Sequence, residues 1–178
     1  MKSITIREKV FTEYISEEEL IRIVDRCASL VAKEINSSQN VAVIGVLNGG
    51  IPFMQKVLDK SDGKVLVDYV KVISYGGGTT SSGKAELILD TSLDVKNKKV
   101  VIIDDIYDTG CTVSFLKQHF KSKGASVVRS ACLFFKKNTN AEQPDYYGCE
   151  VGENFIIGYG LDYAGQGRNL KSIMQTKS

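Results

Sequence analysis

The sequence predicts an α/β fold in which a central, mainly parallel β-sheet is flanked by helices. Residues 100–103 (Val-Val-Ile-Ile) are four consecutive β-branched aliphatics, which suit a strand buried on both faces. Residues 41–47 form a second apolar run of this kind. Segments with helical spacing of apolar residues alternate with these strands, and the alternation indicates a parallel sheet with helices on both faces.

The first helix is predicted to begin after Ser16. Residues 10–15 form a short extended lead-in, and Ser16 followed by three glutamates fits a capping box. Helical spacing is then kept by apolar residues at Leu20, Val24, Cys27, Ala28, Val31 and Ile35. Residues 36–40 are a polar loop that leads into the strand at 41–47.

A second helix follows that strand. The sequence Asn-Gly-Gly-Ile-Pro at residues 48–52 breaks the strand, and a helix carrying Phe53, Val57 and Leu58 comes next. Residues 65–73 alternate enough to form a third strand.

Residues 74–84 are the only low-complexity segment. They are too short for a linker between domains, so we expect a mobile loop inside one domain. Residues 86–89 are expected to pair back as a short strand, which makes the loop a long hairpin over a site.

The second half of the chain repeats the strand–helix pattern. After the strand at 100–103, a helix is predicted from Thr112 to a C-cap at Gly124, and residues 127–135 form a further strand. Short strands are expected near Cys149 and over residues 155–159.

Length and composition predict one globular domain over residues 1–178. The hydrophobic content is 43%, the charged content is 25% and the net charge is +2, which are average values for a soluble protein. This charge gives no reason to expect nucleic acid or a membrane surface as a partner. No signal peptide is visible, and no apolar run reaches the ~20 residues of a membrane helix.

The four cysteines, Cys27, Cys111, Cys132 and Cys149, are scattered and form no C-x-x-C pair. We therefore expect neither a disulfide framework nor a cysteine metal site, and we expect a reducing, cytoplasmic location.

The strongest functional signal is the acidic turn that follows residues 100–103. Asp104 and Asp105 cannot both be buried cheaply, so we expect them at the carboxyl edge of the strand, facing a ligand or a cation. Asp108 and the Thr109-Gly110 turn lead into the next helix, whose first amides are free to bind a phosphate. The spacing fits neither a Walker loop nor a dinucleotide fingerprint. An ordinary turn with solubilising acids is the alternative.

Four separated motifs carry a resemblance to a known family. They are Val46-Leu47-Asn48-Gly49-Gly50, Ser74-Tyr75-Gly76, residues 104–112, and Leu161-Asp162-Tyr163 with Arg168. With Lys136 and the Phe155-Ile156-Ile157-Gly158-Tyr159 stretch, these motifs resemble those of the type I phosphoribosyltransferases, most of all the bacterial hypoxanthine (hypoxanthine-guanine) enzymes.

The resemblance implies a fold, a reaction and partners. The implied fold is the type I phosphoribosyltransferase fold, with a small hood contributed by about residues 1–15 and 140–178. The implied reaction joins a 6-oxopurine to the ribose of phosphoribosyl pyrophosphate and releases pyrophosphate, with Mg²⁺ as cofactor. A homodimer or homotetramer is also implied.

The resemblance also implies roles for individual residues. Asp108 resembles the general acid/base at the purine N7. The 5′-phosphate is bound by Asp108, Thr109, Gly110, Cys111 and Thr112, and the ribose by Asp104 and Asp105. Pyrophosphate is bound by Leu47, Asn48, Gly49 and Arg168. The purine is bound by Lys136, Phe155, Ile156 and Ile106. Ser74 and Tyr75 belong to a lid, and the Mg²⁺ ligands are Asp104, Asp105 and Asp162.

The sequence departs from the family pattern at three positions. Asp104 stands where Glu is common, Asn48 stands where Lys is frequent, and Cys111 replaces a frequent Lys. In the family, the peptide bond between the residues at Leu47 and Asn48 is often cis. A cysteine at a helix N-terminus is expected to be a reactive thiol, so we expect oxidation or alkylation of Cys111 to reduce activity.

Two alternatives stay open. One is a phosphoribosyltransferase for xanthine, adenine or a pyrimidine, although Lys136 argues against adenine. The other is a regulatory protein that senses phosphoribosyl pyrophosphate and binds RNA or DNA. Such a protein is expected to carry a basic face or an added domain.

Overall fold

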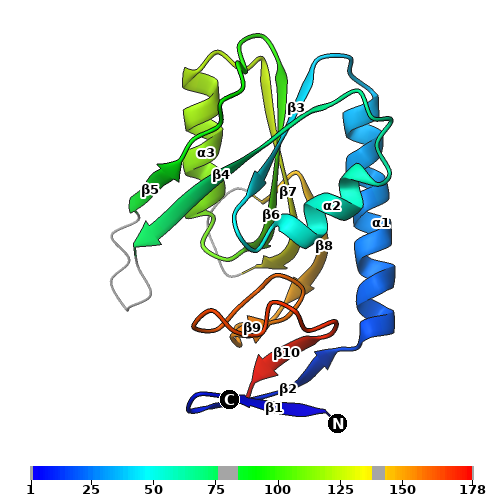
Figure 1. The fold of residues 1–178 in the computed structure, drawn as a ribbon, viewed down its shortest axis with the longest axis vertical. Helices are drawn as coiled ribbons and strands as arrows, with labels where there is room; N and C mark the ends of the chain where they lie inside the picture. Colours follow the sequence, from blue (N-terminus) through cyan, green and yellow to red (C-terminus); the bar gives the residue numbers. More distant parts are fainter. Residues whose placement is uncertain (1, 76–83, 138–142, 178) are drawn as a thin grey trace.

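A six-stranded sheet with helices on both faces forms the larger part of the molecule (Figure 1). The computed structural model describes residues 2–75, 84–137 and 143–177, with the backbone alone at 74, 75 and 84. The strands, in sheet order, are β5 (Lys84–Leu89), β4 (Leu66–Tyr75), β3 (Val41–Val46), β6 (Lys99–Tyr107), β7 (Val127–Lys136) and β8 (Tyr146–Val151). All neighbouring pairs are parallel except β4 with β5, so the predicted α/β class is confirmed.

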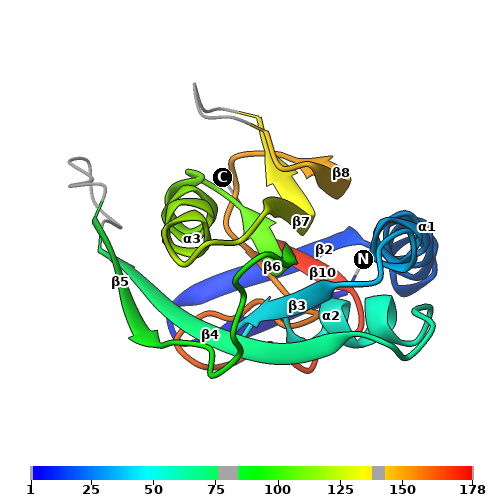
Figure 2. The same cartoon turned by 90° about the horizontal axis from the view of Figure 1, so that it is seen from above.

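The two central strands are buried on both faces, as their apolar runs predict. Val101 and Ile103 of β6 belong to one apolar cluster, whereas Val100 and Ile102 belong to another. The first cluster is covered by α1 (Glu17–Asn36) and α2 (Ile51–Leu58), and the second by α3 (Cys111–Ser122). Figure 2 shows α3 on one side of the sheet and the other two helices on the opposite side.

The helix ends follow the sequence signals. The Ser16 side chain accepts a hydrogen bond from the amide of Glu19 at 3.3 Å, so the predicted cap of α1 is confirmed. At the end of α3, Gly124 has a φ of +84°. The Ala125 amide donates to the Phe120 carbonyl at 3.0 Å, which makes a Schellman motif.

A second, smaller sheet lies beyond the carboxyl ends of the parallel strands (Figure 1). It is antiparallel, in the order β1 (Ser3–Ile6), β2 (Lys9–Ile15), β10 (Ile173–Thr176) and β9 (Ile156–Ile157). The predicted hood segment from about residue 140 therefore begins too early, because β8 pairs with β7 in the main sheet. The sequence patterns also miss β1 and β10, whose four residues each are too few for a clear alternation.

The predicted long hairpin is confirmed for those of its residues that the structure describes. β4 and β5 are antiparallel partners, with Ser74 opposite Ala85 and Tyr75 opposite Lys84. Residues 76–83, the tip of the expected lid, lie outside the described residues. Among the helices described, none has the length and apolar character needed to span a bilayer.

Candidate active site

The acidic turn lies where β6 meets α3, at the edge of the main sheet that faces the second sheet (Figure 1). Its first two acids differ in position from the sequence expectation. β6 continues to Tyr107, so Asp104 and Asp105 lie inside the strand rather than after it. Asp104 is only 7% exposed, next to buried Cys132 on β7. The predicted position after the strand is therefore wrong, whereas the predicted contact of Asp104 with a ligand or a cation stays a prediction.

Burial makes this pair of acids electrostatically unusual. Burial raises the pKa of Asp104 well above its ordinary value, and the charge of Asp105, the second largest cause, raises it further. Burial also raises the pKa of Asp105, although hydrogen bonds from its neighbours and the charge of Arg168 oppose the shift. A cation at the point where the two groups meet would offset the repulsion between their ionised forms.

The β3–α2 turn packs directly against Asp105. The Leu47–Asn48 peptide bond is cis, as the resemblance implies. A Cβ atom on Gly49 would collide with the Asp105 carboxylate, and one on Gly160 would collide with the Gly49 carbonyl. Glycine at 49 is therefore required by a close approach of side chain to backbone. The predicted pyrophosphate loop and the predicted metal ligand Asp105 are thus in contact.

The predicted phosphate loop begins α3. Gly110 is the N-cap residue with a φ of +78°, and a Cβ atom there would collide with the ring of Tyr107. The Thr109 hydroxyl accepts a hydrogen bond from the Cys111 amide at 3.4 Å. Asp108 and Thr109 are exposed, and Cys111 and Thr112 are partly exposed. The first-turn amides of α3 have no acceptor within the helix and carry the positive end of its dipole, which suits an anion.

Lys136 lies beside this loop, although 28 residues separate it from Asp108 in the sequence. Its ammonium Nζ lies 3.4 Å from an Asp108 carboxylate oxygen. Lys136 is only 7% exposed, so it is not a solvent-exposed end of its strand. The parallel register explains the meeting, because Tyr107 is opposite Phe135 and the two strands end together.

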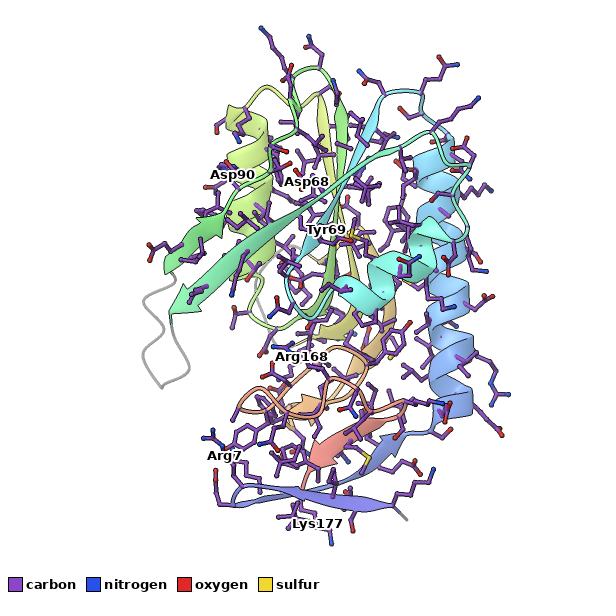
Figure 3. All side chains as sticks on the ribbon, viewed as in Figure 1. Arg7, Asp68, Tyr69, Asp90, Arg168 and Lys177 are labelled. Atoms are coloured by element: carbon purple, nitrogen blue, oxygen red, sulfur yellow. The ribbon has the colours of Figure 1, made fainter. Side chains whose placement is uncertain are left out.

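Asp162 and Arg168 are held together in the loop between β9 and β10. Arg168 Nη2 lies 2.6 Å from one Asp162 oxygen, while the other accepts a hydrogen bond from the Gly165 amide at 2.7 Å. Arg168 also donates to the Gly160 carbonyl at 2.6 Å. Figure 3 places Arg168 between the two sheets. This links Arg168, through the Gly160–Gly49 contact, to the β3–α2 turn.

The predicted purine-binding residues are divided between surface and core. Phe155 is 44% exposed, and its ring meets that of Tyr163 at 5.7 Å and 75°. Ile156 is buried in the first apolar cluster, and Ile106 packs against that cluster. Ile156 and Ile106 thus join the second sheet to the end of β6.

The predicted lid residues Ser74 and Tyr75 end β4, and their side chains lie outside the described part of the structure. Their role stays a prediction, and so does the reactivity of Cys111.

The donor chemistry of the acids decides whether they can hold Mg²⁺. Within residues 2–75, 84–137 and 143–177, no cluster of three or more His, Cys, Asp or Glu side chains could hold a metal. Asp162 is engaged by Arg168, so the Asp104–Asp105 pair is the better donor set. Mg²⁺ is commonly bound by one or two carboxylates with substrate oxygens completing the shell. The residues therefore fit a Mg²⁺ ion that arrives with a polyanionic substrate.

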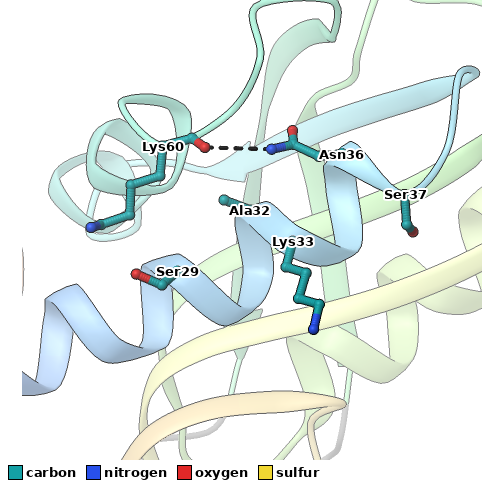
Figure 4. A pocket seen from close by; sticks show the side chains of 6 residues that line it. All are labelled: Ser29, Ala32, Lys33, Asn36, Ser37 and Lys60. Carbon is teal, nitrogen blue, oxygen red and sulfur yellow. Dashed lines mark hydrogen bonds between the residues drawn. The ribbon is translucent and has the colours of Figure 1, made fainter.

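Depressions elsewhere lack these features. One, at the carboxyl end of α1, is lined by Ser29, Ala32, Lys33, Asn36, Ser37 and Lys60 (Figure 4). It contains none of the predicted site residues, and the carboxyl end of a helix disfavours anions. Another is lined by Tyr159, Arg168 and residues of α1 and α2, so it shares Arg168 with the site.

Sequence reasoning missed two residues that shape the site. Gly160, with a φ of +101°, packs on Gly49. Its position two residues before Asp162 could have marked it, because such a glycine indicates a close backbone approach. Tyr107 lies under Gly110 and is buried. Its place in the predicted acidic turn gave no sign of this contact.

A parallel sheet that ends in an acid pair beside an anion-binding helix N-terminus defines a class of proteins that act on phosphorylated ligands. Within this class, the chain belongs to the phosphoribosyl transferase domain family, whose model matches residues 16–164.

The chain is also similar to individual, named members of this family. A hypoxanthine-guanine phosphoribosyltransferase of Streptococcus mutans is 38% identical over 160 residues, which are 89% of this chain and 88% of the relative. A crystal structure of a hypoxanthine phosphoribosyltransferase from Staphylococcus aureus has a TM-score of 0.84 and 30% identity, covering 93% of this chain and 91% of that one. A hypoxanthine-guanine phosphoribosyltransferase from Bacillus anthracis has a TM-score of 0.82 and 30% identity, covering 92% and 97%.

Proposed function

We propose that this chain is a purine-salvage enzyme that transfers the 5-phosphoribosyl group from phosphoribosyl pyrophosphate to hypoxanthine, and also to guanine, giving IMP or GMP and pyrophosphate. One observation carries the choice of base. A buried lysine, Lys136, lies 3.4 Å from the exposed acid Asp108, at the mouth of the α3 anion site. The names of the relatives support the same choice.

In the proposed reaction, a purine nitrogen attacks the anomeric carbon of the ribose while pyrophosphate leaves. The amides and hydroxyls of residues 108–112 hold the 5′-phosphate at the start of α3. Asp108 holds or moves the proton at the purine N7. Both groups belong to one turn, so the turn fixes the position of the bound sugar phosphate relative to the purine.

Lys136 selects the base by hydrogen-bond chemistry. Its ammonium donates to the 6-oxo oxygen of hypoxanthine or guanine, whereas the 6-amino group of adenine also presents donors. Phe155 stacks on the base with its exposed surface, and the Ile156 backbone and Ile106 border the base edge.

The pyrophosphate lies against the Leu47-Asn48-Gly49 turn and Arg168. Asn48 carries no charge, so the backbone of the turn and the guanidinium of Arg168 supply the binding. Arg168 must exchange its Asp162 and Gly160 partners for pyrophosphate oxygens. Asp104 and Asp105 hold Mg²⁺ and border the ribose hydroxyls, and Asp162 is proposed as a second Mg²⁺ ligand. Mg²⁺, when held there, would supply positive charge to offset the negative charge of the pyrophosphate oxygens.

The remaining parts of the proposal rest on the family. Ser74 and Tyr75 belong to a lid that excludes water from the reacting centre. The enzyme forms a homodimer or homotetramer and acts in the cytoplasm as a single domain with a hood.

Spectrophotometric turnover with hypoxanthine, guanine, xanthine and adenine, with and without Mg²⁺, tests the proposal. We expect Mg²⁺-dependent formation of IMP and GMP and little or no reaction with adenine. Turnover of adenine in preference to hypoxanthine, or the absence of turnover with any oxopurine, would contradict it. Filter binding of RNA and DNA in the same preparation tests the regulatory alternative, for which we expect no binding.

A further inference from the structure

The turn between β1 and β2 brings a lysine to two aromatic rings of the β9–β10 region. Lys9 Nζ lies 4.8 Å from the ring centroid of Tyr163 and 5.8 Å from that of Phe155. The two rings themselves meet edge to face at 5.7 Å. Figure 3 marks the location of this turn by Arg7, at the end of the second sheet. A residue near the start of the chain therefore lies against the ring proposed to stack on the base.

Further contacts fix Tyr163 in this arrangement. The Tyr163 hydroxyl donates a hydrogen bond to the Glu8 carboxylate, and its ring packs on Phe11 with centroids 5.8 Å apart. Glu8 and Lys9 are adjacent, so one turn holds Tyr163 by its hydroxyl and by its ring. Tyr163 in turn sets the position of Phe155.

The position of the Lys9 ammonium has an electrostatic cause. The side chain is exposed, so close packing does not force it onto the rings. A cation over an aromatic face is attracted by the ring quadrupole, which at an exposed site favours the arrangement by about two- to fivefold. Phe155 keeps 44% of its surface exposed, which leaves room for a planar ligand.

We propose that Lys9 is a positioning residue for the purine, and that its ammonium holds Phe155 and Tyr163 in the orientation in which Phe155 stacks on the base. This inference rests on the proposed function, in which Phe155 binds the purine. It assigns to the β1–β2 turn an effect on base binding, because the described contacts of the Lys9 ammonium are with the rings of Phe155 and Tyr163. The phosphoribosyl pyrophosphate site is built from β3, β6, α3 and the Asp162–Arg168 pair, so we expect no effect of Lys9 there.

Steady-state kinetics of Lys9→Gln and Lys9→Arg test the proposal. Lys9→Gln removes the charge, and we expect the KM for hypoxanthine to rise by about two- to fivefold. The KM for phosphoribosyl pyrophosphate should stay within about 1.5-fold of the wild-type value. Lys9→Arg keeps a cation that can lie over both rings, so it should restore the hypoxanthine KM.

Lys2→Gln is the matched control. It removes a lysine that directly precedes β1, where Lys2 pairs with Glu13 at 3.8 Å; the described cation–ring contacts do not include it. We expect wild-type KM values for this variant, and an unchanged unfolding temperature for all three. An unchanged hypoxanthine KM in Lys9→Gln, an equal rise in both KM values, or a failure of Lys9→Arg to restore it would overturn the proposal. If the wild-type chain turned over no oxopurine, the proposed function itself would fail.

Discussion

Lys136 and Asp108 show how the register of a parallel sheet builds a site from distant residues. Asp108 follows β6 and Lys136 ends β7. Because these strands are parallel neighbours, the Lys136 ammonium and an Asp108 carboxylate oxygen come within 3.4 Å of each other. The sequence identifies both strands but not their pairing. Their contact was therefore implied by the family resemblance and not by the residues themselves.

Asp108→Asn tests the acid/base role. The amide keeps the shape of the carboxyl group but cannot exchange a proton with the purine N7. We expect kcat to fall by about 100-fold or more, while the KM for phosphoribosyl pyrophosphate changes by less than about twofold. Equal losses in both quantities would show that Asp108 binds substrate rather than moves a proton.

Lys136→Ala tests the choice of base. Loss of a charge-assisted hydrogen bond to the 6-oxo group should lower kcat/KM for hypoxanthine by about 10- to 100-fold, with a much smaller change for adenine. Lys137→Ala, which removes the exposed neighbouring lysine, is the control and should leave the preference intact. An unaltered preference for hypoxanthine in Lys136→Ala would remove the assignment.

At the scale of elements, the β6–α3 junction matches the sequence expectation in kind but not in detail. Gly110 and the start of α3 lie where Thr-Gly predicts a turn. Asp104 and Asp105, however, stay inside β6, because the ladder to β7 continues as far as Tyr107. Aspartate has a low propensity for β-strands, so two aspartates directly after an aliphatic run suggest that the strand has ended. Tertiary pairing overrides that local signal.

Gly110→Ala tests this junction, and Gly63→Ala is its matched control. Both glycines have a φ of +78°, but a Cβ atom at Gly63 meets nothing within 4 Å, whereas one at Gly110 meets Tyr107. Gly63→Ala should therefore lower the free energy of unfolding by only about 1–2 kcal/mol, the cost of placing alanine in a left-handed backbone conformation.

Gly110→Ala should cost more than this and should also raise the KM for phosphoribosyl pyrophosphate by at least about tenfold, because the displaced turn no longer presents its amides. Thermal unfolding and steady-state kinetics of the two variants measure both effects. Equal behaviour of the two would contradict a role for Gly110 in phosphate binding.

At the scale of the whole molecule, charged contacts join elements on which the site depends. Asp145 precedes β8 and contacts Lys117 of α3 at 3.0 Å and Arg129 of β7 at 2.7 Å. Burial alone would raise the pKa of Asp145, but the hydrogen bonds from Lys117, Arg129 and Ser130 hold it at about 2. The sequence shows these charges but not their meeting, because the meeting depends on how α3 packs on the sheet.

Asp145→Asn should therefore destabilise the fold in a pH-dependent way. The folded-state pKa of about 2 lies below the ordinary value of 3.8, so the stabilisation is complete above about pH 4 and is lost as the pH falls through 2. The pKa difference corresponds to about 2 kcal/mol, or roughly 4–8 °C in unfolding temperature for a chain of this size. Circular dichroism melts of both proteins between pH 2.5 and 7 measure it. A difference in unfolding temperature that is the same at both ends of this range would contradict the assignment.

The central claim is that the turn at residues 108–112 binds the ribose phosphate while Lys136 binds the base. A crystal structure with inosine 5′-monophosphate tests it most directly. We expect the phosphate oxygens within about 3.2 Å of the first amides of α3 and the 6-oxo oxygen within the same distance of Lys136 Nζ. A phosphate bound in the depression of Figure 4, or a base beyond hydrogen-bonding reach of Lys136, would contradict the claim.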